Sequence, residues 1–274
     1  MNDDYSHLDT TLIYITESIP GPPTDSPEYK ILVKNFNSQV TLECNCADIC
    51  DHESCDCNKS PGGGNYIKHP ITYKMVLNQC KMTCTDTTSI IECNSMCSCQ
   101  DKCGNRVVQN GPVAGLYVKS CESMEKGLGL FTKDHIPAGS FICEYAGEII
   151  TKDQAALRQG YNALNGKMNY VFCLNEHCDT NSFQTFVDPS FIGNIGRYIN
   201  HSCDPNCVII PVRVNTPIPK LAIFALKDIV PQSEITFRYG SDNSKDFVFL
   251  TKVGRKKCCC NSPKCSGWMP YEVY

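Results

Sequence analysis

Apolar runs rich in β-branched and aromatic residues recur between residues 104 and 240, separated by glycine, proline and asparagine. Such runs are typical of strands bounded by turns. They predict strands at 140–150, 169–174, 185–187, 207–214, 221–226 and 234–240. One helix is expected to begin at Thr151, with Gln154 completing a capping box and Gly160 ending it. Many short strands and few helices indicate a mainly β fold of small sheets.

The flanking regions have weaker patterns. Prolines between residues 20 and 27 are expected to break any helix, so residues 1–43 predict an extended, partly ordered lead-in. Residues 241–257 are polar and become basic toward their end, which predicts a mobile link. No apolar run approaches the roughly 18 residues that a membrane-spanning helix needs. The acidic, polar start does not resemble a signal peptide, so we expect no export.

Cysteine is unusually frequent, with 21 in 274 residues. In a reducing compartment, thiolates bind metal more readily than they form disulfides. A secreted disulfide-bonded protein is the remote alternative, because it would need an export signal. Nine of these cysteines lie in one block, and they are Cys44, Cys46, Cys50, Cys55, Cys57, Cys93, Cys97, Cys99 and Cys103.

This nine-cysteine block fits a metal cluster better than separate sites. Three tetrahedral zinc ions need twelve coordination positions, which nine thiolates supply if three of them bridge two metals each. Few large apolar residues accompany the cysteines, so metal would replace a hydrophobic core there. We expect an architectural role for the cluster. Cys80 and Cys84 lie between its halves and stand outside the pattern.

A second metal site is incomplete in the local sequence. Cys258, Cys260 and Cys265 near the C-terminal end have zinc spacing but lack a fourth ligand. Cys203 is a soft ligand with no close partner in sequence. We therefore infer that Cys203 completes the site, so that zinc clamps the tail over the neighbouring polar pair at 200–201.

Several motifs follow one another in a specific order. After the nine-cysteine block come Lys126-Gly127-x-Gly129, Glu144-Tyr145-x-Gly147-Glu148, Arg197-Tyr198-Ile199-Asn200-His201-Ser202-Cys203 and Cys258-x-Cys260-x4-Cys265. This ordered set resembles the SET-domain histone-lysine N-methyltransferases with pre-SET and post-SET zinc modules, over roughly residues 40 to 271. Within that family, the segments 186–197, 210–213 and 219–221 are most similar to the methyltransferase half of SET–mariner transposase fusions.

The resemblance implies a fold and a domain order. The SET fold consists of small curved sheets with a knot-like crossing, where the strand that ends at Tyr239 passes beside Asn200 and His201. The implied divisions are a lead-in (1–43), a pre-SET zinc-cluster module (44–107), a SET catalytic domain (115–240) and a zinc-binding post-SET tail (255–271).

The resemblance also implies the cofactor S-adenosylmethionine and the residues that hold it. By motif position these are Lys126, Gly127, Leu128, Gly129, Tyr170, Arg197, Asn200, His201 and Trp268. Tyr239 is implied as the catalytic residue at the transfer point, and Tyr145 as a second catalytic residue that hydrogen-bonds near the amine. Phe172 and Phe237 are expected to line the lysine channel, over which Trp268 closes.

The chemistry explains why an aromatic channel suits this reaction. Methyl transfer to an amine is an in-line displacement that depends on alignment and needs no catalytic metal. A lysine has a pKa near 10.4, so about one side chain in 2,500 is neutral at pH 7. Desolvation and a nearby cationic sulfonium both lower that pKa. In this family, phenylalanine at the position of Phe237 leaves room in the channel, which implies di- or trimethylation.

Three positions depart from the family pattern. Arg238 replaces an acidic residue next to Tyr239, Leu128 replaces a tryptophan, and Asn175 stands where an acidic substrate contact is common. Arg238 reverses a charge near the site. It is the basis of the alternative function, a catalytically weakened SET-domain module that binds chromatin.

The partners follow from charge and from the resemblance. The formal net charge of −4 suits a basic partner better than DNA. The resemblance implies a histone tail, most commonly that of histone H3, as the peptide substrate, with chromatin as the partner. It also implies a place in the nucleus on the chromosome. No membrane contact and no direct sequence-specific DNA binding are expected.

Overall fold

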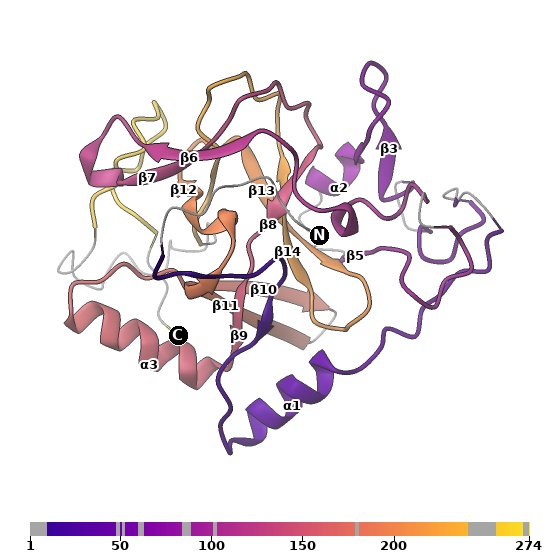
Figure 1. Cartoon of the computed structure of the whole chain (residues 1–274), viewed down its shortest axis with the longest axis horizontal. Helices are drawn as coiled ribbons and strands as arrows, with labels where there is room; N and C mark the ends of the chain where they lie inside the picture. The colour runs from indigo at the N-terminus through magenta and orange to yellow at the C-terminus, as the bar shows by residue number, and fades with distance from the viewer. Residues whose placement is uncertain are drawn as a thin grey trace.

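The architecture is mainly β, as the sequence predicts (Figure 1). A computed structural model describes residues 10–47, 50, 53–59, 63–83, 89–100, 103–178, 181–240, 256–270 and 274. Its described strands form a five-stranded sheet, a four-stranded sheet and three two-stranded pairs. No helix among the described residues is long and apolar enough to cross a membrane.

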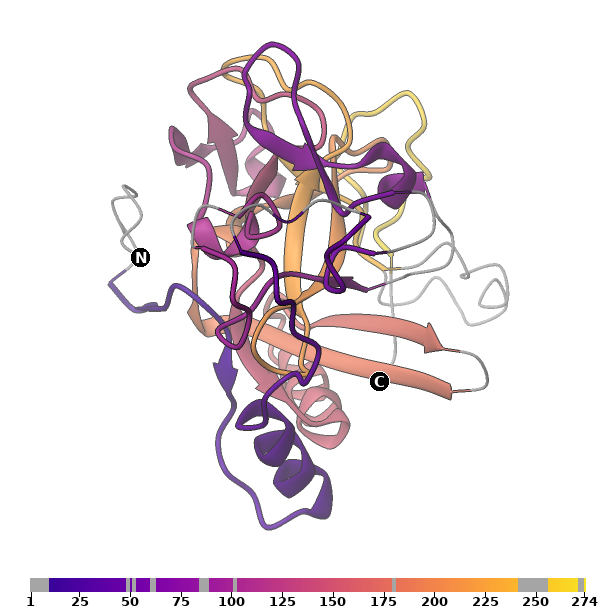
Figure 2. The same cartoon turned by 90° about the vertical axis from the view of Figure 1, so that its right-hand side faces the viewer.

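The five-stranded sheet supports the site from one side. Its long strands β10 (Phe172–Cys178) and β11 (Asn181–Gly193) form an antiparallel hairpin that projects from the molecule in Figure 2. On its other edge β11 pairs with β9 (Gly147–Ile150), and helix α3 (Lys152–Leu164) lies along these strands in Figure 1. The sheet therefore positions Phe172, a predicted channel residue, at the start of β10.

The four-stranded sheet joins the cysteine block to the rest of the molecule. Its order is β5 (Ile90–Ile91), β13 (Cys207–Arg213), β14 (Lys220–Ala225) and β8 (Phe141–Glu144). Strand β5 leaves the middle of the cysteine block and pairs in parallel with β13. The smaller elements of this region are β3 (Tyr66–Lys68), β4 (Met75–Leu77), α2 (Gln79–Thr83) and the 3₁₀ turn η1 (Val108–Asn110).

Two short pairs complete the centre. Strands β6 (Leu116–Ser120) and β7 (Leu128–Thr132) form a hairpin around the 3₁₀ turn η2 (Met124–Lys126). After the 3₁₀ turn η3 (Ile195–Tyr198), strand β12 (Asn200–His201) pairs in parallel with β15 (Thr236–Phe237). This pair is the crossing that the resemblance implies.

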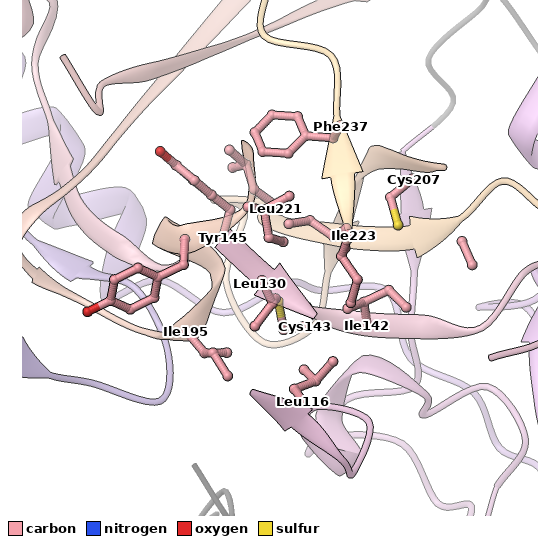
Figure 3. Packing of buried hydrophobic residues seen from close by; sticks show 14 of the residues in the cluster. Leu116, Leu130, Ile142, Cys143, Tyr145, Ile195, Cys207, Leu221, Ile223 and Phe237 are labelled. Atoms are coloured by element: carbon pink, nitrogen blue, oxygen red, sulfur yellow. The ribbon is translucent and has the colours of Figure 1, made fainter. Parts of the chain in front are cut away.

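The main hydrophobic core lies between these sheets and continues into the site. Figure 3 shows side chains from β6, β7, β8, β13 and β14 packed around Ile142 and Ile223, which are fully buried. Tyr145 and Phe237 belong to the same cluster. Burial of such side chains is worth about 1.5–3 kcal/mol each, so the core also holds the two aromatic residues in place.

The N-terminal segment is more ordered than the sequence predicts. Strands β1 (Ile13–Tyr14) and β2 (Ile19–Pro20) add to the edges of the five-stranded sheet, and α1 spans Pro27–Phe36. The expectation that Pro27 would break a helix was wrong. Proline occupies the first turn, where its missing N–H costs nothing, and the Ser26 side chain caps the helix by accepting from the Tyr29 N–H.

Helix α3 confirms one detail of the prediction and corrects another. The Thr151–Gln154 capping box is present, with both reciprocal hydrogen bonds. Gly160 does not end the helix, which continues to Leu164 before the chain turns at Gly166 with φ +63°. A glycine costs about 1 kcal/mol inside a helix but does not stop it. The predicted mobile link falls on residues 241–255, outside the described residues, and on 256–257.

We predict that Gly160→Ala stabilises the protein. A Cβ at this position would meet no atom within 4 Å, and alanine is the better helix former. The free energy of unfolding in urea should rise by about 0.5–1 kcal/mol. Gly196→Ala is the contrast, since its Cβ would lie 2.6 Å from the Glu144 carbonyl oxygen. A loss of stability in Gly160→Ala would mean that α3 does not continue through residue 160.

Candidate active site

The crossing of β12 and β15 brings distant segments into contact. Asn200 pairs with Thr236 and His201 with Phe237. The Tyr239 backbone N–H donates to Nδ1 of His201 at 3.1 Å, and the Ser202 N–H donates to the Phe237 carbonyl at 3.1 Å. Tyr239 therefore lies beside the Asn200–His201 pair, as the resemblance implies.

Four of the predicted channel aromatics form one cluster. The rings of Tyr145, Phe172 and Phe237 lie 5.7–6.0 Å apart in edge-to-face pairs. The Tyr239 ring lies 4.9 Å from that of Phe237. Such geometry is the preferred one for aromatic pairs. Segments at residues 145, 172 and 237–239 thus supply one apolar wall.

Both tyrosine hydroxyls are fixed by backbone carbonyls. Tyr145 donates to the carbonyl of Tyr170 at 2.7 Å, and Tyr239 donates to the carbonyl of Ile199 at 2.6 Å. Burial raises the pKa of each phenol above its ordinary value. Both side chains therefore stay protonated near neutral pH, and neither can act as a general base there.

The glycine turn lies next to Asn200. Gly127 follows η2 with φ +68°, a conformation that favours glycine. A Cβ at Gly129 would lie 2.7 Å from the Cys121 sulfur, so this position also admits only glycine without rearrangement. The Asn200 side chain donates to the Leu128 carbonyl at 3.0 Å. The structure thus brings together the turn and the Asn200 segment.

Glu234 is a residue that the sequence analysis missed. Its carboxylate accepts from the Lys126 ammonium, from the Asn200 side chain at 2.9 Å and from the Cys121 thiol at 3.4 Å. Burial, followed by the Glu234 charge, raises the pKa of Cys121 to about 11. The carboxylate links three segments of the site. Its only signal in the sequence is a charge directly before an apolar strand.

The Arg197 side chain is held by stacking and a hydrogen bond, whereas the His201 side chain is uncharged. The Arg197 guanidinium stacks 4.7 Å from the centre of the Tyr170 ring and donates to the Pro189 carbonyl at 3.1 Å. Burial, and then the charges of Arg238 and Lys126, lowers the pKa of His201 to about 4. His201 is therefore neutral at pH 7. Because its Nδ1 accepts a hydrogen bond, its proton lies on Nε2, which faces the Cys203 sulfur at 3.4 Å.

Three further residues singled out in the sequence have other surroundings. Trp268 is in the tail, where it forms an antiparallel bridge with Lys257, and its closure over the channel stays a prediction. Arg238 is exposed. The Asn175 side chain accepts from Gln184 at 2.9 Å in the β10–β11 hairpin.

The structure brings together the four cysteines of the inferred tail site. The sulfurs of Cys203, Cys258, Cys260 and Cys265 all lie within 4.8 Å of one another. The Lys264 ammonium also contacts Asp204 at 3.0 Å, beside the site. The neighbouring Cys259 points elsewhere, since its thiol donates to Glu125 at 2.9 Å.

The first cysteine block forms three overlapping groups. They are Cys44–Cys50–Cys55–Cys93, Cys44–Cys57–Cys93–Cys97 and Cys50–Cys93–Cys99–Cys103. Cys44, Cys50 and Cys93 are each shared between groups, and Cys46 packs against the cluster. Cys80 is exposed, and Cys84 lies outside the described residues.

Sulfur separations test whether metal fits these sites. Four sulfurs about 2.3 Å from one zinc ion would lie about 3.8 Å from each other. The separation is 3.6 Å for Cys44–Cys50, 3.8 Å for Cys44–Cys93 and 3.9 Å for Cys203–Cys258. The cysteine side chains that the structure describes form no disulfide. The donor sets therefore fit a thiophilic metal, and the disulfide alternative is not supported.

Comparisons with known proteins agree with this geometry. The SET domain family matches residues 127–240, and the Pre-SET motif matches residues 1–106. The chain is 37% identical over 272 residues to histone-lysine N-methyltransferase SETMAR of Bos taurus, covering 94% of this chain and 81% of that protein.

Solved structures show the same fold. The methyltransferase domain of human SETMAR matches with a TM-score of 0.75 at 32% identity, covering 97% of this chain and 91% of that one. KRYPTONITE, solved with DNA, an H3(1–15) peptide and SAH, matches with a TM-score of 0.69 at 26% identity, covering 95% of this chain and 48% of that one. The chain therefore belongs to the SET-domain histone-lysine N-methyltransferase family.

Proposed function

We propose that this protein transfers methyl groups from S-adenosylmethionine to a lysine of a histone tail, with histone H3 as the substrate. The observation that carries the proposal is the aromatic cluster of Tyr145, Phe172, Phe237 and Tyr239 at the β12–β15 crossing. The similarity to KRYPTONITE, whose structure contains an H3 peptide and SAH, supports both ligands.

The aromatic cluster prepares the amine for attack. Enclosure of a lysine side chain by apolar rings disfavours its charged form. A pKa lowered by three units would correspond to about 4 kcal/mol. Because the pKa values of Tyr145 and Tyr239 are raised by burial, neither phenol takes the proton. The proton therefore leaves to solvent, and the two hydroxyls align the neutral amine.

The proposed cofactor site surrounds the same crossing. When bound, S-adenosylmethionine supplies the methyl group on a cationic sulfonium. We assign its binding to the backbone of residues 126–129 and to Tyr170, Arg197, Asn200, His201 and Trp268. Glu234 positions this set, because it holds both Lys126 and Asn200. A Cβ added at Gly129 would lie 3.0 Å from a carboxylate oxygen of Glu234, so glycine at this position lets the turn lie close to Glu234.

We assign the metal as zinc, three ions in the first cysteine block and one at the tail. The three shared residues Cys44, Cys50 and Cys93 are the bridging thiolates, and the other six are terminal ligands. Cys55 would be a terminal ligand of the zinc shared by Cys44 and Cys50, and we assign its remaining position to Cys46, which packs against the cluster. Zinc here contributes folding energy and no chemistry to the methyl transfer.

A location in the nucleus, on chromatin, follows from a histone substrate. The relatives' names support it. The exposed Arg238 directly before Tyr239 keeps one second candidate open, a module that binds chromatin with weakened catalysis.

Tyr239→Phe decides between these two functions. The chain should methylate a histone mixture, as detected by mass spectrometry, and Tyr239→Phe should lower the rate about 100-fold because the amine loses its alignment. Tyr73→Phe, at a residue 70% exposed, should match the wild type. Absence of any methyl transfer by the wild type would favour the binding module instead.

Phe237→Tyr should change the product. The Phe237 ring is fully buried against Tyr145 and Phe172, so an added hydroxyl enters the channel. Products should shift from di- or trimethyl toward monomethyl lysine, with the first methyl transfer slowed less than about tenfold. Mass spectra of a methylated peptide over time measure this. An unchanged product distribution would contradict the assignment of Phe237.

Cys203→Ala should remove one metal ion. The wild type is expected to contain about four zinc ions per chain, and Cys203→Ala about three, because three thiolates hold zinc poorly. Cys207→Ala is the control, since Cys207 is buried in the apolar core and belongs to no metal group. Elemental analysis of purified protein gives both values. Equal zinc content in all three proteins would refute the tail site.

A further inference from the structure

Tyr274 occupies a second, smaller core beneath α3. Both views place the C-terminal end of the chain next to α3 and β11 (Figures 1 and 2). The side chain packs against a cluster of buried residues that are Ile150, Ala155, Val171, Cys173 and Phe186. Tail and sheet therefore meet here, nine residues after Cys265, the last of the four tail cysteines.

Specific contacts hold this residue. Its ring meets that of Phe186 edge to face, with centroids 5.2 Å apart and an interplanar angle of 82°. Its hydroxyl donates to the Val171 carbonyl at 3.0 Å, and its backbone N–H donates to the Gln159 side chain at 3.4 Å. Ala155 is the buried residue of α3. Its small side chain leaves room for the tyrosine ring between helix and sheet.

The Val171 carbonyl, to which Tyr274 donates, lies between two residues of the proposed site. Val171 lies between Tyr170, which we assign to the cofactor, and Phe172, which lines the channel. Tyr145 holds the carbonyl of Tyr170 at 2.7 Å, and Tyr274 holds the next carbonyl. Two tyrosines that are distant in sequence thus fix consecutive peptide groups at the start of β10.

Tyr274 also limits where Trp268 can go. Cys265 belongs to the group of four cysteines that would hold the metal, Trp268 follows three residues later, and Tyr274 six residues after that. Six residues span at most about 20 Å. The Met269 N–H donates to the Lys256 carbonyl at 2.9 Å, which ties Trp268 to the metal-binding end of the tail. A docked Tyr274 adds a contact between the tail and the five-stranded sheet on the other side of Trp268.

We propose that Tyr274 is a positioning residue that anchors the tail beyond Trp268, confines Trp268 near Tyr170 and Phe172, and so strengthens S-adenosylmethionine binding. The inference rests on the proposed function, because it assigns the tail to the cofactor site. The tail would then be attached to the rest of the protein at two places, by metal at Cys203 and by the apolar contacts of Tyr274.

Trp268 is the only tryptophan in the sequence, so its fluorescence reports on the tail alone. The time-resolved anisotropy of Trp268 and the dissociation constant for S-adenosylmethionine would be measured in Tyr274→Ala and Tyr274→Phe. Tyr161→Ala is the control, because Tyr161 is an aromatic residue of α3 that is 54% exposed. Methylation assays on the same proteins give kcat separately.

In Tyr274→Ala, the local motion of Trp268 should increase and the dissociation constant should rise about tenfold, or about 1.4 kcal/mol, with kcat within about twofold. Tyr274→Phe keeps the ring, so Trp268 should stay rigid and the constant should rise about threefold. Tyr161→Ala should match the wild type. If Tyr274→Ala does not fold, Tyr274→Leu, which also lacks the ring, should give the same results.

Unchanged anisotropy and affinity in Tyr274→Ala would overturn the proposal. So would a lower melting temperature and kcat with an unchanged dissociation constant, since Tyr274 would then only fill the core. Failure of the proposed function has a different signature. The wild type would then bind no S-adenosylmethionine and transfer no methyl group, while the anisotropy of Trp268 would still show whether Tyr274 anchors the tail.

Discussion

Four sulfurs at the end of β12 set the geometry on which the site depends. Cys203 and Cys258 are 55 residues apart in sequence, yet their sulfurs lie 3.9 Å from each other. Cys203 lies two residues after His201, and His201 accepts the backbone hydrogen bond of Tyr239. One short segment therefore contacts both Tyr239 and the tail cysteines. Metal binding would make that link part of folding itself.

The electrostatics of the site suit an uncharged amine. Burial holds the pKa of His201 down to about 4 and raises those of the two tyrosines, so all three groups are neutral at pH 7. The nearby charges are paired with groups of the protein. Lys126 is bound to Glu234, and Arg197 is stacked on Tyr170. A lysine entering among the aromatic rings would gain from losing its proton.

The sequence predicted those features that depend on residue type or local spacing. The longer strands from β8 to β14, the capping box of α3 and the gathering of Cys203 with the tail cysteines were predicted, the last because three thiolates leave a tetrahedral site incomplete, whereas the β6–β7 hairpin was not. The aromatic residues at 145, 172, 237 and 239 were proposed for the channel from the family resemblance, and the structure brings their rings into one cluster.

Other features depend on contacts that no local pattern encodes. In the sequence, Glu234 is only an acidic residue that precedes a predicted strand. Its contacts with Lys126 and Asn200 form only in the folded protein. Helix α1 was not predicted, because proline interrupts the interior of a helix. Pro27 lies in the first turn of α1, where proline is tolerated. Tyr274 shows no motif at all. Its environment is assembled from β9, α3, β10 and β11.

The most direct test of this account is the position of the metal in the tail. Anomalous diffraction at the zinc edge would locate each bound zinc ion in crystals of the protein. We expect one peak about 2.3 Å from each of the sulfurs of Cys203, Cys258, Cys260 and Cys265. A tail that is docked elsewhere, or a zinc ion there that does not bind Cys203, would contradict the account.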